Sequence, residues 1–215
     1  DRFTEGSPVY SQIDGKYEIT YHRFNPNYDE RFTTVFPRMW SNMDPQHEQD
    51  YQQWAQIKGT RIQFRNDRGE VETIVKPTMG ENLRFFFRYQ VNHMYWRYFM
   101  WNFVGRQNDI QGHGDILYGN WLSGIKFIDE ARLGNQDNLP AELANNKARN
   151  TYFFLPLLLG LLGIFFQYNR GKEGKKGLWV VFLLFVLTGL AIVIYLNQYP
   201  HQPRERDYAY AGSFY

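Results

Sequence analysis

The chain has 215 residues, and its 24 Lys and Arg and 22 Asp and Glu leave a net charge of +2. This balance excludes a strongly basic nucleic-acid-binding protein and a highly charged disordered chain. The sequence contains no cysteine, which excludes disulfide scaffolds, thiolate zinc sites, iron–sulfur clusters and thiol nucleophiles. Aromatic residues make up 19% of the chain, enough bulk for a core or for a membrane interface.

Two β-hairpins and one helix are predicted near the N-terminus. In residues 6–21, VYSQI and KYEITY flank Asp14-Gly15, and Asp-Gly between β-rich segments is a strong hairpin signal. TRIQF and VETIV flank the turn-forming sequence NDRG in the same way, which predicts a second hairpin. Between them, Asp44-Pro45 predicts the start of a helix that runs to about Ile57.

Residues 81–106 are predicted to form a long, aromatic-rich helix with two opposed polar stripes. One stripe contains Arg84, Arg88, Asn92, Asn102 and Arg106, and the other contains Gln90, His93 and Arg97. In a membrane-spanning helix Arg97 would lie near the centre of the bilayer, at a cost of about 2.5–3.5 kcal/mol. We therefore expect a helix at the membrane interface, which keeps the arginines in water. The alternative is a core helix whose arginines pair with carboxylates.

The loop sequence RQNDIQGHGDI follows this helix and contains weak candidates for a metal site. Asp109, His113 and Asp115 could ligate a divalent cation through oxygen-rich coordination. The glycines on either side of His113 equally indicate a structured turn without a metal. We therefore predict no cofactor and keep a divalent metal as the alternative.

Two uncharged stretches predict a transmembrane helical hairpin over residues 151–196. Twenty uncharged residues separate Arg149 from Arg170, and twenty-seven separate Lys176 from Arg204. A helix of nineteen residues spans about 28 Å, close to the thickness of the bilayer hydrocarbon. The alternative, a pair of buried core helices, is disfavoured because neither stretch has a polar face. The predicted fold class is therefore an integral membrane protein, mainly α, with an α+β region before the hairpin.

The loop at 167–177 predicts the orientation of this hairpin. It carries four basic residues, Arg170, Lys172, Lys175 and Lys176. The positive-inside rule then places the loop in the cytoplasm. Residues 1–150 and 197–215 would form extracytoplasmic regions, the second as a segment that re-enters from the membrane.

The segment NQYPHQPRERDYAYAGSFY is a candidate anion site directly after the second span. Its ionisable residues include His201, Arg204, Arg206 and Asp207. The two prolines disfavour a regular helix, and in an extended chain the two arginines lie on the same face. Two guanidinium groups on one face can bind a phosphate bidentately. The alternative is a stop-transfer cluster that only anchors the span.

Several long strings together resemble a large family of bacterial multi-span membrane proteins of unknown function, similar to protein O-mannosyltransferases. These strings include YDERFTTVFPRMWS, FRYQVNHMYWRYFMWNFVGRQNDIQG, GNWLSGIKF, NTYFFLPLLLGLLG and YPHQPRERDYAYAGSFY. The resemblance extends from about Asn27 to Tyr215. It implies an interior piece of a larger helical bundle of the GT-C glycosyltransferase type, with many spans in the bacterial inner membrane and residues 1–150 and 197–215 on the periplasmic side.

The resemblance also implies an activity. Such enzymes transfer a sugar from a lipid-linked phosphate donor to Ser or Thr of an extracytoplasmic acceptor protein. The family's catalytic carboxylate is expected in an Asp-Cys-Gly-Glu-like string that this sequence lacks, so the catalytic residue is expected outside this chain.

Candidates for binding the donor phosphate are nevertheless present. The first are Arg204 and Arg206, with His201 and Asp207 as neighbours, and the second are Arg97 and His93. The implied partners are the bilayer, the lipid-linked sugar phosphate and the acceptor protein. The alternative is a membrane scaffold or secretion-associated factor that binds a partner protein through its extracytoplasmic region, without catalysis.

Overall fold

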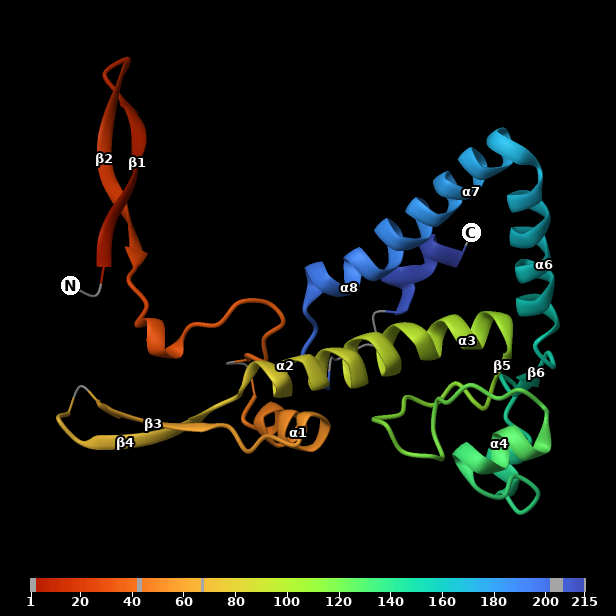
Figure 1. Ribbon diagram of the computed structural model, residues 1–215. Coiled ribbons are helices and arrows are strands. Elements are labelled where there is room, and N and C mark those ends of the chain that lie inside the picture. The colour runs from red at the N-terminus through yellow and green to blue at the C-terminus, as the bar shows by residue number, and fades with distance from the viewer. Residues whose placement is uncertain (1–2, 42–43, 67, 202–206, 215) are drawn as a thin grey trace. The chain divides into compact units, whose positions relative to one another are not determined.

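The computed structural model describes residues 3–41, 44–66, 68–201 and 207–214 (Figure 1). The chain divides into two units: Asp1–Phe36 with Gly59–Lys76, and Pro37–Lys58 with Pro77–Tyr215. The described residues form a mixed α+β structure with three two-stranded sheets. The helix expected between the two hairpins belongs to the second unit.

The first unit contains both predicted hairpins, which the structure confirms. Strands β1 (Phe3–Ile13) and β2 (Lys16–Pro26) are antiparallel, and both residues of the Asp14-Gly15 turn have positive φ. This is the backbone conformation that Asp-Gly favours in a two-residue hairpin turn. Strands β3 (Thr60–Arg65) and β4 (Val71–Lys76) form the second hairpin. A short 3₁₀ helix, η1 (Glu30–Phe32), lies between the hairpins in sequence.

In the second unit, helix α1 (Gln46–Ala55) confirms the helix predicted after Asp44-Pro45. The Asp44 side chain accepts a hydrogen bond from the backbone N–H of Gln46 at 2.8 Å, as an N-terminal capping residue does. The helix ends two residues before the predicted Ile57. Gln56 adopts the left-handed conformation and closes the last turn there.

The predicted aromatic-rich helix is one continuous helix made of α2 (Met79–Phe85), the π-helix η2 (Phe86–Trp96) and α3 (Arg97–Phe103). It begins with a capping box, in which Thr78 and Glu81 exchange side-chain-to-backbone hydrogen bonds of 3.3 and 2.7 Å. The π segment was not predicted. Its wider turns change which residues share a face, so a plot at 100° per residue describes this segment only approximately.

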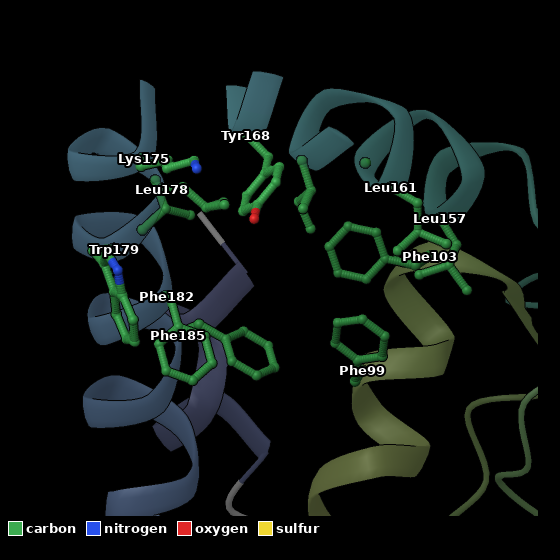
Figure 2. A pocket seen from close by; sticks show the side chains of 13 residues that line it. Phe99, Phe103, Leu157, Leu161, Tyr168, Lys175, Leu178, Trp179, Phe182 and Phe185 are labelled. Atoms are coloured by element: carbon green, nitrogen blue, oxygen red, sulfur yellow. The ribbon is translucent and has the colours of Figure 1, made fainter. Parts of the chain in front are cut away.

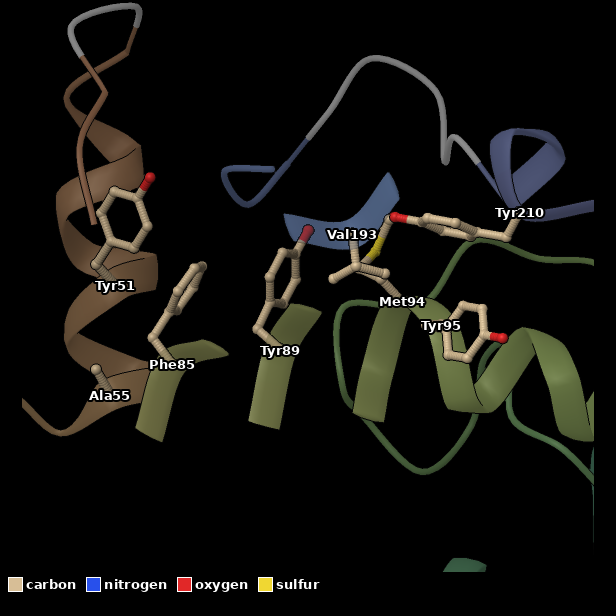
Figure 3. Packing of buried hydrophobic residues seen from close by; sticks show 8 residues of the cluster. All are labelled: Tyr51, Ala55, Phe85, Tyr89, Met94, Tyr95, Val193 and Tyr210. Atoms are coloured by element: carbon tan, nitrogen blue, oxygen red, sulfur yellow. The ribbon is translucent and has the colours of Figure 1, made fainter. Parts of the chain in front are cut away.

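The hydrophobic core of the second unit is largely aromatic (Figure 3). It joins α1, the long helix, the end of the last apolar helix and the C-terminal 3₁₀ helix η4 (Asp207–Phe214). Its buried members are Tyr51, Ala55, Phe85, Tyr89, Met94, Tyr95, Val193 and Tyr210. The hydroxyl of Tyr95 donates to Ser213 Oγ at 3.3 Å, so the polar end of a core ring is satisfied.

Residues 104–154 connect the long helix to the apolar helices. They contain the two-residue strands β5 (Gly105–Arg106) and β6 (Asn150–Thr151), which pair with each other, and the helices α4 (Lys126–Leu133) and α5 (Ala141–Ala144). The buried Asp129 carboxylate accepts three hydrogen bonds of 2.7–3.0 Å from Ser123 and Gly124, which fixes the entry to α4.

The apolar segments are helical. Helix α6 (Leu155–Asn169) is followed by α7 (Gly171–Phe185), the π-helix η3 (Val186–Leu190) and α8 (Ala191–Leu196). The last three form one helix of 26 residues, which is long and apolar enough to cross a membrane; α6 has 15 residues and is shorter than a usual span.

The predicted loop 167–177 is not a loop. Only Arg170 separates α6 from α7, and residues 171–177 form the first turns of α7. The charged segment between two apolar stretches predicts a loop, but its three lysines are compatible with a helix, and the Lys176–Glu173 ion pair at 2.7 Å stabilises a helix that begins at Gly171.

Candidate functional site

Five ionisable side chains from separate parts of the sequence gather beyond the C-terminal end of α8. We call this group the histidine cluster: Asp50, His93, Arg97, His113 and His201. The helix stops at Leu196 because Asn197 adopts a left-handed conformation. The chain then turns, and His201 follows five residues after the end of the apolar helix.

An Asp–His pair lies at the centre of the cluster. The distance between Asp50 Oδ1 and His201 Nε2 is 3.2 Å. The Asp50 residue is only 7% exposed, whereas about a third (34%) of the His201 side chain is exposed. Among the described residues, the second carboxylate oxygen of Asp50 has no hydrogen-bond partner. A buried carboxylate oxygen therefore lies close to a histidine whose side chain is partly exposed.

His113 lies against His201, with 4.0 Å between the ring centroids and a tilt of 30°. Two glycines hold the loop in place. A side chain at Gly112 would overlap the carbonyl of Tyr118, and one at Gly114 would lie 2.6 Å from the Trp54 ring, at a φ of +98°. The sequence Gly-His-Gly thus positions a histidine here. Burial and nearby His201 lower the pKa of His113, while Asp115 and Asp50 oppose this shift.

His93 lies deeper in the cluster, on the π-helical segment. Its Nε2–H donates to the carbonyl of Gly112 at 3.1 Å, and its ring contacts those of Trp54 and Tyr89. Burial lowers the pKa of His93 to about 3, and the charge of Arg97 acts in the same direction. His93 is therefore neutral at physiological pH.

Arg97 supplies a buried positive charge to the cluster. Only 4% of the residue is exposed. Its Nε donates to the carbonyl of His93 at 2.8 Å and its Nη1 to the carbonyl of Gly119 at 2.9 Å. The guanidinium carbon lies 4.8 Å from the centroid of the Trp101 ring, a cation–π geometry. These contacts fix the guanidinium in one orientation.

The two polar stripes of the long helix have different environments. Gln90, His93 and Arg97 are buried. Arg84 and Arg88, on the other stripe, are exposed and donate to the backbone carbonyls of α1 at 2.9 and 3.3 Å. The described contacts of these arginines include backbone carbonyl groups and the Trp101 ring.

The structure brings some of the predicted site residues together. His201, His93 and Arg97 join the histidine cluster, together with His113 from the metal candidates. Arg204 and Arg206 lie outside the described residues. Asp207 begins η4, and its side chain is also outside the description.

The sequence reasoning missed Asp50, which is 151 positions from His201. One signal was present. Asp50 shares a face of α1 with His47, Tyr51 and Trp54, and a buried acidic residue on an otherwise aromatic face indicates a specific partner.

The three candidate metal ligands do not come together. Asp109 Oδ1 accepts a hydrogen bond from the Asn146 side chain at 3.0 Å. Asp115 Oδ1 accepts from the backbone N–H groups of Leu117 and Tyr118. Within the described parts of the chain, no three His, Asp or Glu side chains are grouped so as to hold a metal ion.

An apolar groove of about 580 Å³ lies among α3, α6 and α7 (Figure 2). Its walls are formed by side chains from all three helices, including Phe99, Phe103, Leu157, Leu161, Phe182 and Phe185. Near the junction of α6 and α7 the groove is lined by Tyr168 and Lys175, with the ammonium 4.4 Å from the ring centroid. The groove is thus apolar along its length and cationic at one end.

Comparisons with known proteins identify one relationship. Residues 1–87 match a family of unknown function (DUF8416). This region includes all of the first unit and ends at the second residue of the π-helical segment. A search of curated proteins finds no match, and a search of solved structures finds none either.

Proposed function

We propose that this chain is part of a membrane glycosyltransferase that transfers a sugar from a lipid-linked phosphate donor to Ser or Thr of an extracytoplasmic protein. The histidine cluster would form part of the donor site. The observation that carries the proposal is the place of the cluster: ionisable residues from four segments meet directly after a helix able to cross a membrane. The phosphate of a lipid-linked donor lies at the membrane surface, where a membrane-spanning helix ends.

The chemistry of the cluster suits a departing phosphate. Negative charge on the phosphate grows as the sugar leaves, and a fixed cation stabilises it. Arg97 is such a cation, because its carbonyl contacts and Trp101 hold it in place. Arg204 and Arg206 follow His201 by three and five residues and would add bidentate contacts.

The proposal includes a membrane arrangement. Helix α6 and the Gly171–Leu196 helix would form a transmembrane hairpin in a protein with further spans, with their junction in the cytoplasm. Most apolar side chains of both helices are exposed, as lipid-facing residues are. Helix α3 lies across the open side of this hairpin (Figure 1), where an interfacial helix would lie. The apolar groove would then accommodate a hydrocarbon chain.

Sugar transfer by the full-length protein tests the proposal. Purified protein in liposomes receives a polyprenyl-phosphate sugar and acceptor peptides. We expect transfer to fall about tenfold or more in Arg204→Ala and in Arg206→Ala, since a charge-assisted hydrogen bond contributes roughly 1.5–3 kcal/mol. Arg68→Ala, on an exposed hairpin turn, is the control. Absence of transfer by folded wild-type protein, or wild-type rates in both variants, would contradict the proposal.

A second candidate function is binding of a partner protein without catalysis, and one observation favours it. An isolated two-stranded hairpin is only marginally stable in water. Nevertheless β1 and β2 expose large apolar side chains on both strands, with Tyr17 76% and Phe24 73% exposed. If this hairpin is the docking surface, Tyr17→Ser with Phe24→Ser should abolish site-specific crosslinking to the partner, and the wild-type protein should transfer no sugar. Unchanged crosslinking in this folded variant would exclude it.

A further inference from the structure

The proposed donor site gives no role to Asp50, the acidic member of the histidine cluster. Asp50 is acidic and buried, so it cannot itself attract a phosphate. Its Oδ1 lies 3.2 Å from His201 Nε2, and its Oδ2 has no partner among the described residues. A buried carboxylate oxygen left unpaired is costly, and such groups often have a functional reason. We therefore consider what the Asp50 carboxylate does to the neighbouring His201 ring.

The Asp50 contact selects one tautomer of His201. Carboxylate oxygens accept hydrogen bonds, so the 3.2 Å distance between Asp50 Oδ1 and His201 Nε2 favours a hydrogen on Nε2. In the neutral ring the lone pair is then on Nδ1, and the described residues give Nδ1 no partner. A carboxylate that holds a histidine in this way prepares the opposite nitrogen to accept a proton.

The backbone and the second histidine hold His201 in the same place. His201 has a φ of +52°, a conformation that residues with side chains rarely adopt. Strained residues of this kind concentrate at functional sites. The His113 ring covers one side of His201, which leaves part of its edge accessible. Among the described residues, the charged and titratable groups that act on His113 are His201, Asp115, Asp50 and Arg97.

We propose that His201 accepts the proton of the acceptor hydroxyl during sugar transfer, and that Asp50 is the residue that positions it. This inference rests on the proposed function. In the step, the hydroxyl oxygen of Ser or Thr forms a bond to C1 of the sugar, and its proton passes to Nδ1. The bond between C1 and the phosphate oxygen breaks, and the phosphate leaves with the electron pair. His201 then releases the proton to water.

The assignment places a proton acceptor within this chain, whereas the family resemblance led us to expect the catalytic carboxylate outside it. A histidine suits the role because imidazole is the side chain most often used as a general base. A proton-accepting role for His201 can be distinguished from a phosphate-binding role by kinetics. Loss of a proton acceptor lowers kcat, whereas loss of a phosphate contact weakens donor binding.

Kinetics of the full-length protein separate the two roles. We expect kcat to fall about a hundredfold or more in Asp50→Asn and in His201→Gln, the contribution usual for a general base. The KM for the donor and the affinity for polyprenyl phosphate should change less than about threefold. His22→Gln, on the exposed β2 strand, is the control. Unchanged kcat, or an equal fall in donor affinity, would overturn the inference.

A second variant tests the role of His201 independently, in case the first variants do not fold. His201→Gly relieves the positive φ, because glycine adopts this conformation without strain. It also leaves a space beside His113 that added imidazole can enter. We expect imidazole to raise kcat of this variant at least tenfold and to leave His22→Gln unchanged. Absence of rescue in folded protein would contradict a proton-accepting role.

A spectroscopic measurement tests the role of Asp50 directly. ¹⁵N-histidine NMR of the wild type should give the Nε2–H tautomer for His201, and Asp50→Asn should give a mixture. The Nδ1–H tautomer in the wild type would overturn the positioning role. If wild-type protein transfers no sugar, the proposed function fails. If it transfers sugar but Asp50→Asn and His201→Gln match its kcat, the inference fails alone.

Discussion

Acidification should destabilise this protein through His93. This histidine is buried against Trp54 and Tyr89, and its pKa is lowered to about 3. In the unfolded chain its pKa is about 6.5. Between these two values the unfolded state binds a proton that the folded state does not, so the free energy of unfolding falls as the pH falls.

The size of this effect follows from the gap between the two pKa values. Well below pH 6.5, His93 contributes a loss of about 1.4 kcal/mol per pH unit. At pH 5 the loss is roughly 2 kcal/mol relative to pH 7.5, and it stops growing near pH 3. A loss of this size is a large part of the stability of an ordinary domain. Acidification should also lower the free energy of unfolding through His113, because the pKa of His113 is also lowered.

Unfolding of the full-length protein in detergent, followed between pH 7.5 and 4.5, measures this contribution. The matched variant is His93→Gln, whose amide can still donate to the carbonyl of Gly112 but does not titrate. The variant should be less stable at pH 7.5, because it loses two ring contacts. Its free energy of unfolding should fall less steeply as the pH falls. The slope should be smaller than that of the wild type by about 1.4 kcal/mol per pH unit. Parallel curves for the two proteins would refute a buried neutral His93.

Two other predictions concern the loop and the topology. Gly114→Ala should lower the free energy of unfolding by roughly 1–3 kcal/mol, because the φ of +98° is strained for alanine and the new methyl group meets Trp54; wild-type stability of this variant would show that the loop is not clamped. In a cysteine-free full-length background, Lys172→Cys and Arg68→Cys should react with an impermeant thiol reagent from opposite sides of the membrane, and labelling from one side would refute the proposed topology.

The sequence predicted those elements whose signals are local. The Asp14-Gly15 turn and the Asp44 cap each depend on a few adjacent residues, and the structure contains both elements. The end of α1 at Gln56 was missed, because a non-glycine residue adopts the left-handed conformation there. The π-helical segment was also missed, since periodicity alone does not reveal a change in helix type.

The candidate site was predictable only in part, because its contacts are distant in sequence. His93, Arg97 and His201 stood out as ionisable residues beside apolar segments. No local pattern connects Asp50 with His201, or His113 with His201, and only tertiary packing brings them together. The glycines beside His113 indicated a turn, but the reason for them is contact with Tyr118 and Trp54.

The most direct test of the central claim is photocrosslinking of a polyprenyl phosphate that carries a photoreactive group next to the phosphate. The probe is incubated with full-length protein in liposomes, and the labelled peptides are identified by mass spectrometry. We predict labelling of peptides that contain His113 or residues 197–207, suppressed by unlabelled polyprenyl phosphate but not by polyprenol. Labelling confined to residues 167–177, or labelling that polyprenol suppresses equally, would contradict a phosphate site at the histidine cluster.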